Sequence, residues 1–176
     1  VGLLTLQVLK ASGAVVTALD VREESLNLAK SMGANFTFNT SSSNIMEELL
    51  NVTDGVGHDI VFETAGAAET PRMAINYTRK GGKTILVGIY SSEPKMDFNE
   101  IVNFEREVIG SVAASHGDME TAVYLLNEGK IDPSSLISDV ISLDNVIKEG
   151  YERMNTSSKD VFRVLVGSWE IMILEL

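Results

Sequence analysis

The sequence of 176 residues contains no cysteine, so it can form neither disulfide bonds nor thiolate metal sites. It has two histidines and no His-Glu-x-x-His pattern, which argues against a histidine-based metal site as well. A chain without cysteine fits a reducing compartment, and we expect the protein to be cytoplasmic. No stretch approaches the roughly 20 consecutive apolar residues of a membrane-spanning helix, so we expect no membrane partner.

Basic residues are scarce and scattered along the chain. There are 14 lysines and arginines against 25 aspartates and glutamates, which gives a formal net charge of −11. Nucleic-acid binding needs a cluster of positive side chains that replace the counterions of the phosphates. We find no such cluster and therefore expect no nucleic-acid partner; the negative charge is interpreted as a solvated surface.

Several common catalytic patterns are also missing from the sequence. It has no Gly-x-Ser-x-Gly turn of serine hydrolases, no complete phosphate-binding P-loop, and no Tyr-x-x-x-Lys pair of short-chain dehydrogenases. His58 precedes an expected strand and His116 precedes an expected helix, so neither is a candidate catalytic base. We therefore assign no catalytic residue to this chain.

Short apolar runs alternate with helical patterns of about ten residues along most of the chain. The expected strands are 14–19, 35–38, 59–62, 84–88, 107–113, 140–142 and 161–166. The expected helices are 2–12, 22–32, 45–51, 68–78, 117–127 and 145–154, with a short helical piece near Asn99. Residues 80–83 (KGGK) are an expected turn. Such alternation predicts an α/β fold, a doubly wound parallel sheet with helices on both faces.

Asp20 closes the apolar run 14–19, which directly follows the amphipathic helix that begins near Gly2. A carboxylate at the end of the second strand of a strand–helix–strand unit accepts hydrogen bonds from adenosine ribose hydroxyls in dinucleotide-binding folds. It also repels a 2′-phosphate, which favours NAD over NADP. Two alternatives stay open: Asp20 could cap the following helix, and Arg22 could accommodate a 2′-phosphate.

Five segments in order carry a family resemblance: Gly2-Leu3-Leu4, Asp20, and the segments 57–66 (GHDIVFETAG), 80–88 (KGGKTILVG) and 105–111 (EREVIGS). Together they resemble the cofactor-binding half of zinc-dependent medium-chain dehydrogenases, above all the polyol, threonine and butanediol dehydrogenases. The resemblance covers residues 1 to about 166 and implies a Rossmann-like fold.

By this resemblance, Gly2 is the third glycine of the pyrophosphate turn, so the first strand and the rest of that turn would precede residue 1. We therefore expect an N-terminally truncated fold, with its zinc-bearing catalytic domain also missing. The implied parent activity is oxidation of a secondary alcohol or polyol to a ketone by hydride transfer to NAD, with zinc not bound by this chain. The alternatives are a non-catalytic module that senses NAD(H) and a methyltransferase.

The resemblance also implies a division of the chain and a partner. Residues 1–131 would form the dinucleotide-binding domain, and residues 132–166 would pack back toward the missing domain. The atypical tail, residues 167–176, could dock as a substitute strand in the gap left by the first strand, or could simply fray. The strand 107–113 would lie at the edge of the sheet and could pair with its copy in a homodimer.

The cofactor contacts implied by the resemblance fall into four groups. Those at the pyrophosphate are Gly2, Leu3 and Arg163; those at the adenosine ribose are Asp20, Val21 and Arg22. Thr64, Ala65 and Gly66 would lie against the adenosine and the nicotinamide ribose. Val87, Gly88 and Ile89 would meet the nicotinamide carboxamide, followed by Ser111 and Ala113. The alternatives are structural: turns that need glycine, and an edge-strand arginine in solvent. Ser25 stands where family members often carry a basic residue, which leaves the choice between NAD and NADP open.

Overall fold

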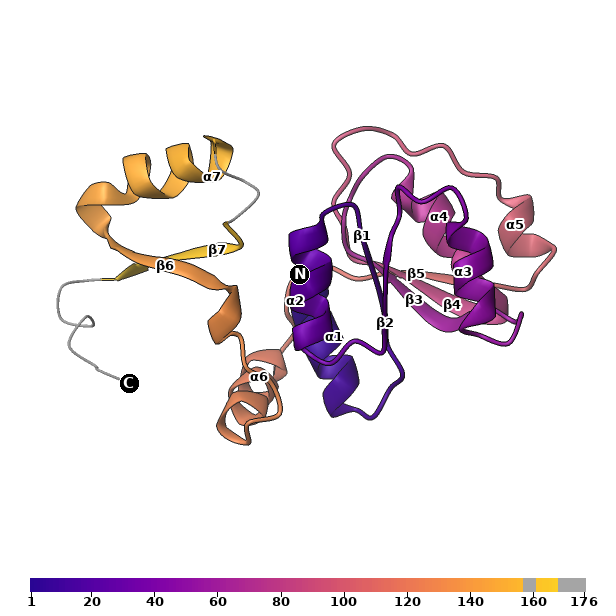
Figure 1. Ribbon diagram of the computed structural model, residues 1–176, viewed down its shortest axis with the longest axis horizontal. Coiled ribbons are helices and arrows are strands. Elements are labelled where there is room, and N and C mark those ends of the chain that lie inside the picture. Colours follow the sequence, from indigo (N-terminus) through magenta and orange to yellow (C-terminus); the bar gives the residue numbers. More distant parts are fainter. Residues whose placement is uncertain (157–160, 168–176) are drawn as a thin grey trace.

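The computed structural model describes residues 1–156 and 161–167 of the chain (Figure 1). Its α-helices are α1 (Gly2–Ala11), α2 (Glu23–Ser31), α3 (Ile45–Asn51), α4 (Thr70–Tyr77), α5 (Asn99–Val102), α6 (Asp118–Asn127) and α7 (Arg153–Thr156). Its strands are β1 (Thr17–Asp20), β2 (Phe36–Asn39), β3 (His58–Glu63), β4 (Thr78–Leu86), β5 (Glu107–Gly110), β6 (Ile137–Ser142) and β7 (Arg163–Gly167). A π-helical segment, Val146–Glu152, leads directly into α7.

The strands form three sheets with four ladders among the described residues, and every pairing is parallel. β1 pairs with β2, β3 pairs with β4 and β4 with β5, and β6 pairs with β7. Parallel pairs with helical crossovers confirm the predicted α/β class. Within residues 1–156 and 161–167 no strand pairs with both β1 and β3, so these two strands lack a shared partner, as expected from the sequence.

Apolar side chains at helical spacing hold the first helices against the β1–β2 ladder. Leu6 of α1, Ala29 of α2 and Val16 before β1 are buried and form one core cluster. Flanking apolar residues pack around it: Leu3, Leu9, Ala14, Ala18, Met32 and Ala34. Each large side chain buried in this way contributes roughly 1.5–3 kcal/mol. This cluster fixes the direction in which α1 and β1 point toward the rest of the molecule.

Two predicted strands are shorter in the structure. The first begins at Thr17 rather than residue 14, because its ladder with β2 starts at the pair Thr17 and Phe36. The strand predicted over 107–113 ends at Gly110, because Ala113 adopts a left-handed conformation (φ 58°) that a strand does not accommodate. In the described part of the chain β5 pairs with β4 alone. The homodimer through this edge stays a prediction.

The fourth strand is longer than predicted and contains a bulge. Residues 80–83, predicted as a turn, lie inside β4, where the register with β3 shifts between His58 and Ile60. The buried hydroxyls of Thr78 and Thr84 hydrogen-bond each other at 2.8 Å across this bulge. Gly82 has no room for a side chain there, since an added Cβ would lie 2.8 Å from the carbonyl oxygen of Asp59.

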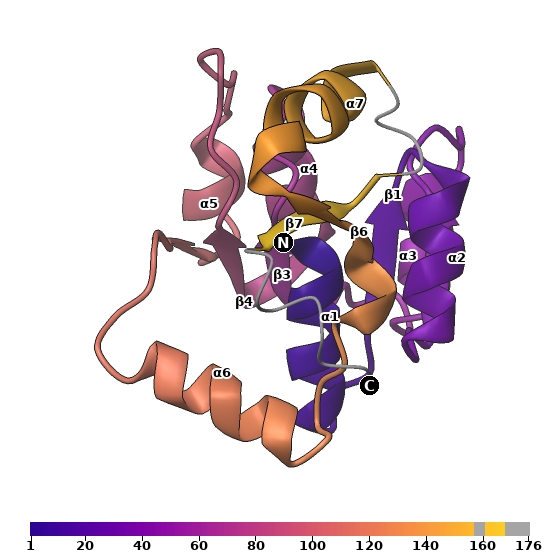
Figure 2. The same cartoon turned by 90° about the vertical axis from the view of Figure 1, so that its left-hand side faces the viewer.

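The C-terminal unit, residues 132–156 and 161–167, lies on the side of the molecule where α1 and the N-terminus lie (Figures 1 and 2). Gln7 of α1 anchors its start: Nε2 donates to the carbonyl oxygen of Asp132 at 2.8 Å, and Oε1 accepts from the Asp132 N–H at 2.6 Å. At its end, the guanidinium of Arg22 stacks on the ring of Phe162, 5.5 Å from the centroid. The division into 1–131 and 132–166 stays a prediction, and most of the proposed substitute strand, 168–176, lies outside the described residues.

His58 joins β3 to β1 across the position where no described strand lies. Its Nε2 is 3.0 Å from Thr17 Oγ1, so the first residues of the two strands touch. Burial lowers the pKa of His58, although a hydrogen bond with the Tyr77 backbone and the charge of Asp59 raise it in part. The neutral ring is therefore favoured in the folded chain.

This contact predicts that stability decreases as the pH falls through about 6.5, the ordinary pKa of histidine. The unfolded chain binds the proton more readily than the folded chain, so protonation favours unfolding. Urea unfolding at pH 7.5 and 5.5 should show a larger loss of free energy for the native sequence than for His58→Gln. His116→Gln, at the exposed second histidine, is the matched control. An equal pH response in the native sequence and His58→Gln would contradict the prediction.

Candidate functional site

The residues that follow β3 and β4 gather at one edge of the molecule, where the start of α1 also lies. β3 and β4 are parallel, so Thr64 and Val87 leave their strands on the same side. The first residue of β1, Thr17, touches the first residue of β3. The carboxyl ends of parallel strands are where α/β proteins bind ligands. The edge therefore collects most of the residues singled out from the sequence.

Asp20 lies at the last position of β1, with a third of its side chain (33%) exposed. Its Oδ1 accepts a hydrogen bond of 2.9 Å from the N–H of Arg22, the residue that caps α2, and lies 3.7 Å from Arg22 Nε. One carboxylate oxygen of Asp20 is therefore engaged at the entry of α2, which is the alternative role considered from the sequence. It does not remove the carboxylate from solvent, and the neighbouring Val21 is 64% exposed.

The start of α1 lies against the end of β3. A Cβ added to Gly2 would lie 2.8 Å from Thr64 Oγ1, so glycine allows this close approach. The first N–H groups of a helix have no partner within the helix and form its positive pole, which suits an anion such as phosphate. The charge of Arg163 acts on Val1, the residue directly before α1. Gly2, Leu3 and Arg163 therefore share one electropositive corner.

The turns after β3 and β4 pack backbone against backbone. A Cβ on Gly66 would lie 2.5 Å from the carbonyl oxygen of Ile89, and a Cβ on Gly88 would lie 2.5 Å from the Gly66 nitrogen. Gly66 also has a left-handed φ of 69°, so the predicted need for backbone freedom is real. The structure thus brings together residues 64–66 and 87–89, with Ile89 largely exposed at the rim.

Glu63, the last residue of β3, holds these turns and was not among the candidate residues from the sequence. It is buried (4% exposed), and its Oε1 accepts hydrogen bonds from the N–H groups of Ala65 (2.8 Å) and Gly66 (2.9 Å) and from Thr70 Oγ1 (2.8 Å). Oε2 accepts from the hydroxyl of Tyr90. A carboxylate closing an apolar strand is a signal that could have identified it, since a buried charge must be paired.

The environment keeps Glu63 ionised. Burial raises the pKa of its carboxyl, but the hydrogen bonds from Tyr90, Gly66, Thr70 and Ala65 together outweigh this and leave it below its ordinary value. The pKa of Tyr90 is raised in turn, by its own burial and by the carboxylate it faces. Tyr90 therefore stays a hydrogen-bond donor at any physiological pH.

Ser111 and Ala113 lie beyond the end of β5, and both are exposed. The N–H of Ser111 donates to the carbonyl oxygen of Leu86 at 2.9 Å, which places its backbone beside the end of β4. Ala113 lies two residues further, after the chain has left the strand. The structure thus brings the Ser111 backbone to the edge and gives no contact that ties Ala113 to it.

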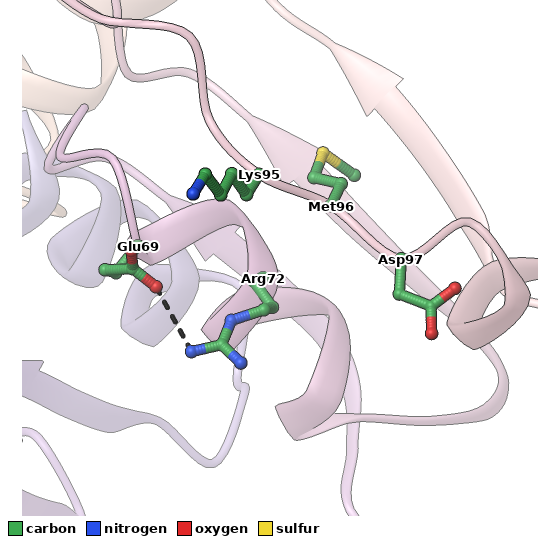
Figure 3. A pocket seen from close by; sticks show the side chains of 5 residues that line it. All are labelled: Glu69, Arg72, Lys95, Met96 and Asp97. Atoms are coloured by element: carbon green, nitrogen blue, oxygen red, sulfur yellow. Dashed lines mark hydrogen bonds and ion pairs between the residues drawn. The ribbon is translucent and has the colours of Figure 1, made fainter.

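A separate hollow of about 410 Å³ lies beside α4 and the segment that follows β4 (Figure 3). Five residues line it: Glu69, Arg72, Lys95, Met96 and Asp97. Arg72 Nη2 and Glu69 Oε2 form an exposed ion pair at 3.1 Å across part of it. No residue predicted from the sequence lines this hollow, so it is distinct from the edge at the strand ends.

Metal and membrane sites were also sought among residues 1–156 and 161–167. In this part of the chain no three histidine, aspartate or glutamate side chains lie close enough together to hold a metal ion. The donor set needed for zinc is therefore not offered by the described residues. None of the described helices has the length and apolar character that crossing a bilayer requires.

Comparison with known proteins gives a family match over most of the chain. The model of a family described as zinc-binding dehydrogenase matches residues 1–128. Sorbitol dehydrogenase of Halalkalibacterium halodurans is 34% identical over 142 residues, which are 78% of this chain and 41% of that protein. (R,R)-butanediol dehydrogenase of Bacillus subtilis is 31% identical over 168 residues, 94% of this chain and 47% of the relative.

Solved structures agree with the sequence relatives. The crystal structure of 2R,3R-butanediol dehydrogenase from Bacillus subtilis matches with a TM-score of 0.84 at 30% identity, covering 93% of this chain and 47% of that chain. An oxidoreductase of unknown specificity from Escherichia coli matches with a TM-score of 0.86 at 25% identity, covering 94% and 48%. The chain spans about half the length of the curated relatives it matches.

Proposed function

Because this chain belongs to the zinc-binding dehydrogenase family, we propose that it binds and orients NAD(H) in an alcohol or polyol dehydrogenase. The family match confirms the resemblance read from the sequence. The proposed reaction of the whole enzyme is oxidation of a secondary alcohol to a ketone, with hydride passing to C4 of the nicotinamide. The names of the sorbitol and butanediol relatives support an alcohol or polyol as substrate. The family match does not favour an NAD(H) sensor or a methyltransferase.

One observation carries the proposal: the turns after β3 and β4 pack against each other beside the start of α1, and Asp20 ends β1 with its carboxylate partly exposed. Asp20 offers a carboxylate for the adenosine ribose hydroxyls. The start of α1 and Arg163 offer N–H groups and positive charge for the pyrophosphate. The turns 64–66 and 87–89 offer backbone groups for the nicotinamide half.

The preference for NAD over NADP follows from the charges around Asp20. Its partly exposed carboxylate would repel a 2′-phosphate. Arg22 could attract that phosphate, but it is engaged by Asp20 on one side and by the ring of Phe162 on the other. We therefore propose NAD as the cofactor.

We place the zinc of the family outside the described residues. They hold no cluster of three ligating side chains, and the sequence has no cysteine. Polarisation of the substrate oxygen would then be the task of other parts of the enzyme. This chain would bind and orient the cofactor.

Titration of the purified chain with NADH and NADPH, followed by nicotinamide fluorescence, tests the assignment. We expect NADH to bind at least about 10-fold more tightly, and Asp20→Ala to weaken NADH binding about 10- to 100-fold, because it removes a charged hydrogen-bond acceptor. Glu24→Gln, at an exposed carboxylate of α2, is the control and should bind as the native chain does. No binding of NADH at millimolar concentration would refute the proposed function.

A further inference from the structure

We propose that Glu63 is a positioning residue for the nicotinamide half of the bound dinucleotide, and that Tyr90 locks it in place. The inference rests on the proposed function, since it concerns the same ligand. The inference goes beyond the proposed function because Glu63 is not expected to touch the cofactor. Glu63 would act by fixing the relative positions of the two turns, 64–66 and 87–89, that the nicotinamide and its ribose contact.

The contacts of Glu63 reach both turns at once. Its side chain binds the N–H groups of Ala65 and Gly66 in the first turn. Its own carbonyl oxygen accepts hydrogen bonds from the N–H groups of Val87 (2.8 Å) and Gly88 (3.1 Å) in the second. A single residue therefore ties the two segments together through both its backbone and its carboxylate.

Two hydroxyl groups complete the arrangement from outside the turns. Thr70 Oγ1, in the first turn of α4, donates to Oε1 at 2.8 Å. The Tyr90 hydroxyl donates to Oε2 from the segment that leaves β4. Tyr90 directly follows the second turn, and removal of its hydroxyl would free Oε2 while leaving the bonds of Oε1 to the first turn in place.

A ligand can reach the two turns that Glu63 holds, whereas Glu63 itself is buried. Glu63 is 4% exposed, while Ala65 is exposed and Ile89 is 84% exposed. A buried ionised group is costly unless several donors face it. Here four donors face it, and their common effect is to hold accessible peptide groups in one orientation. Small displacements of such groups cause large losses in ligand positioning.

The adenosine half should depend on Glu63 less than the nicotinamide half does. Asp20 belongs to the β1 side of the molecule, and Glu63 makes no contact with Asp20 among the interactions of the described residues. The start of α1 meets the first turn at Thr64, with which the Glu63 carboxylate makes no hydrogen bond among these interactions. AMP contains the adenosine and one phosphate but no nicotinamide. It therefore reports on the fold, on the β1 side and on the first turn, while NADH also reports on the second turn and the nicotinamide half.

The test is calorimetric titration of the native chain and its variants with NADH and with AMP. We expect Glu63→Ala to weaken NADH binding 10-fold or more and to change AMP binding less than about 3-fold. Glu63→Gln should restore much of the loss, because an amide oxygen can still accept from Ala65 and Gly66. Tyr90→Phe should weaken NADH binding about 3-fold, again with AMP binding retained.

Glu69→Ala is the matched control, since Glu69 is an exposed carboxylate six residues along the chain. It should bind both ligands as the native chain does. Equal losses for NADH and AMP in Glu63→Ala, or unchanged NADH binding in Tyr90→Phe, would overturn the inference. If Glu63→Ala does not fold, the comparison of NADH binding with AMP binding in Tyr90→Phe and Glu63→Gln tests the inference instead. A native chain that binds AMP but not NADH would instead refute the proposed function, and the inference with it.

Discussion

Replacing Gly88 by alanine is expected to abolish NADH binding and to lower the free energy of unfolding by about 2–3 kcal/mol. The added Cβ would lie 2.5 Å from both Glu63 Oε2 and the Gly66 nitrogen, and 2.7 Å from Gly66 Cα. Two of these neighbours are backbone atoms, which cannot move without opening the turn after β3. The substitution therefore affects stability and the proposed cofactor surface together.

Gly110→Ala is the control for this substitution. Gly110 ends the neighbouring strand β5, and an added Cβ there would meet nothing within 4 Å. We expect its effect to stay within about 0.5 kcal/mol, the usual range for surface changes. Urea unfolding followed by circular dichroism, with NADH titration of the same samples, checks both parts. Equal stability of Gly88→Ala and Gly110→Ala would contradict the prediction. It would mean that the turns 64–66 and 87–89 can move apart with little loss in the free energy of unfolding.

Replacing Gln7 by leucine should cost about 1–3 kcal/mol of stability. The buried Gln7 side chain satisfies both the N–H and the carbonyl group of Asp132, at 2.6 and 2.8 Å. Leucine can do neither, so two hydrogen bonds are lost, each worth about 0.5–1.5 kcal/mol. The change should also loosen the start of the C-terminal unit, because this pair of bonds joins it to α1.

Thermal unfolding and limited proteolysis measure the two consequences separately. The Gln7→Leu chain should unfold at lower temperature, and cleavage between α6 and β6 should be faster than in the native chain. Ser12→Ala, which removes an exposed hydroxyl bonded to the Val8 carbonyl oxygen, is the control. Unchanged proteolysis in Gln7→Leu would mean that other contacts hold the C-terminal unit.

The sequence was sufficient for the fold class and for much of the element order. Short apolar runs between helical patterns predicted the parallel strands, and α3 has the bounds 45–51 predicted for it. These features are local, so the pattern of neighbouring residues is enough to predict them. Asp20 was also located correctly at the end of β1, because its position depends on one strand alone. Its contact with a cofactor stays a prediction.

What the sequence did not reveal depends on contacts between distant residues. Tyr90 binds Glu63 across 27 positions, and Gln7 binds Asp132 across 125. No periodicity encodes such pairs, because they arise only when parallel strands and their helices pack. The bulge in β4 was mistaken for a turn for the same reason: glycines at 81 and 82 mark a bend, but the register with β3 decides where it lies.

The order of the ladders has a consequence for how the chain acquires its structure. Each described strand pairs only with a strand adjacent to it in the sequence: β1 with β2, β3 with β4, β4 with β5, and β6 with β7. Each pairing closes one crossover between consecutive strands, so its entropic cost is small. During synthesis we expect each ladder to form soon after its second strand leaves the ribosome.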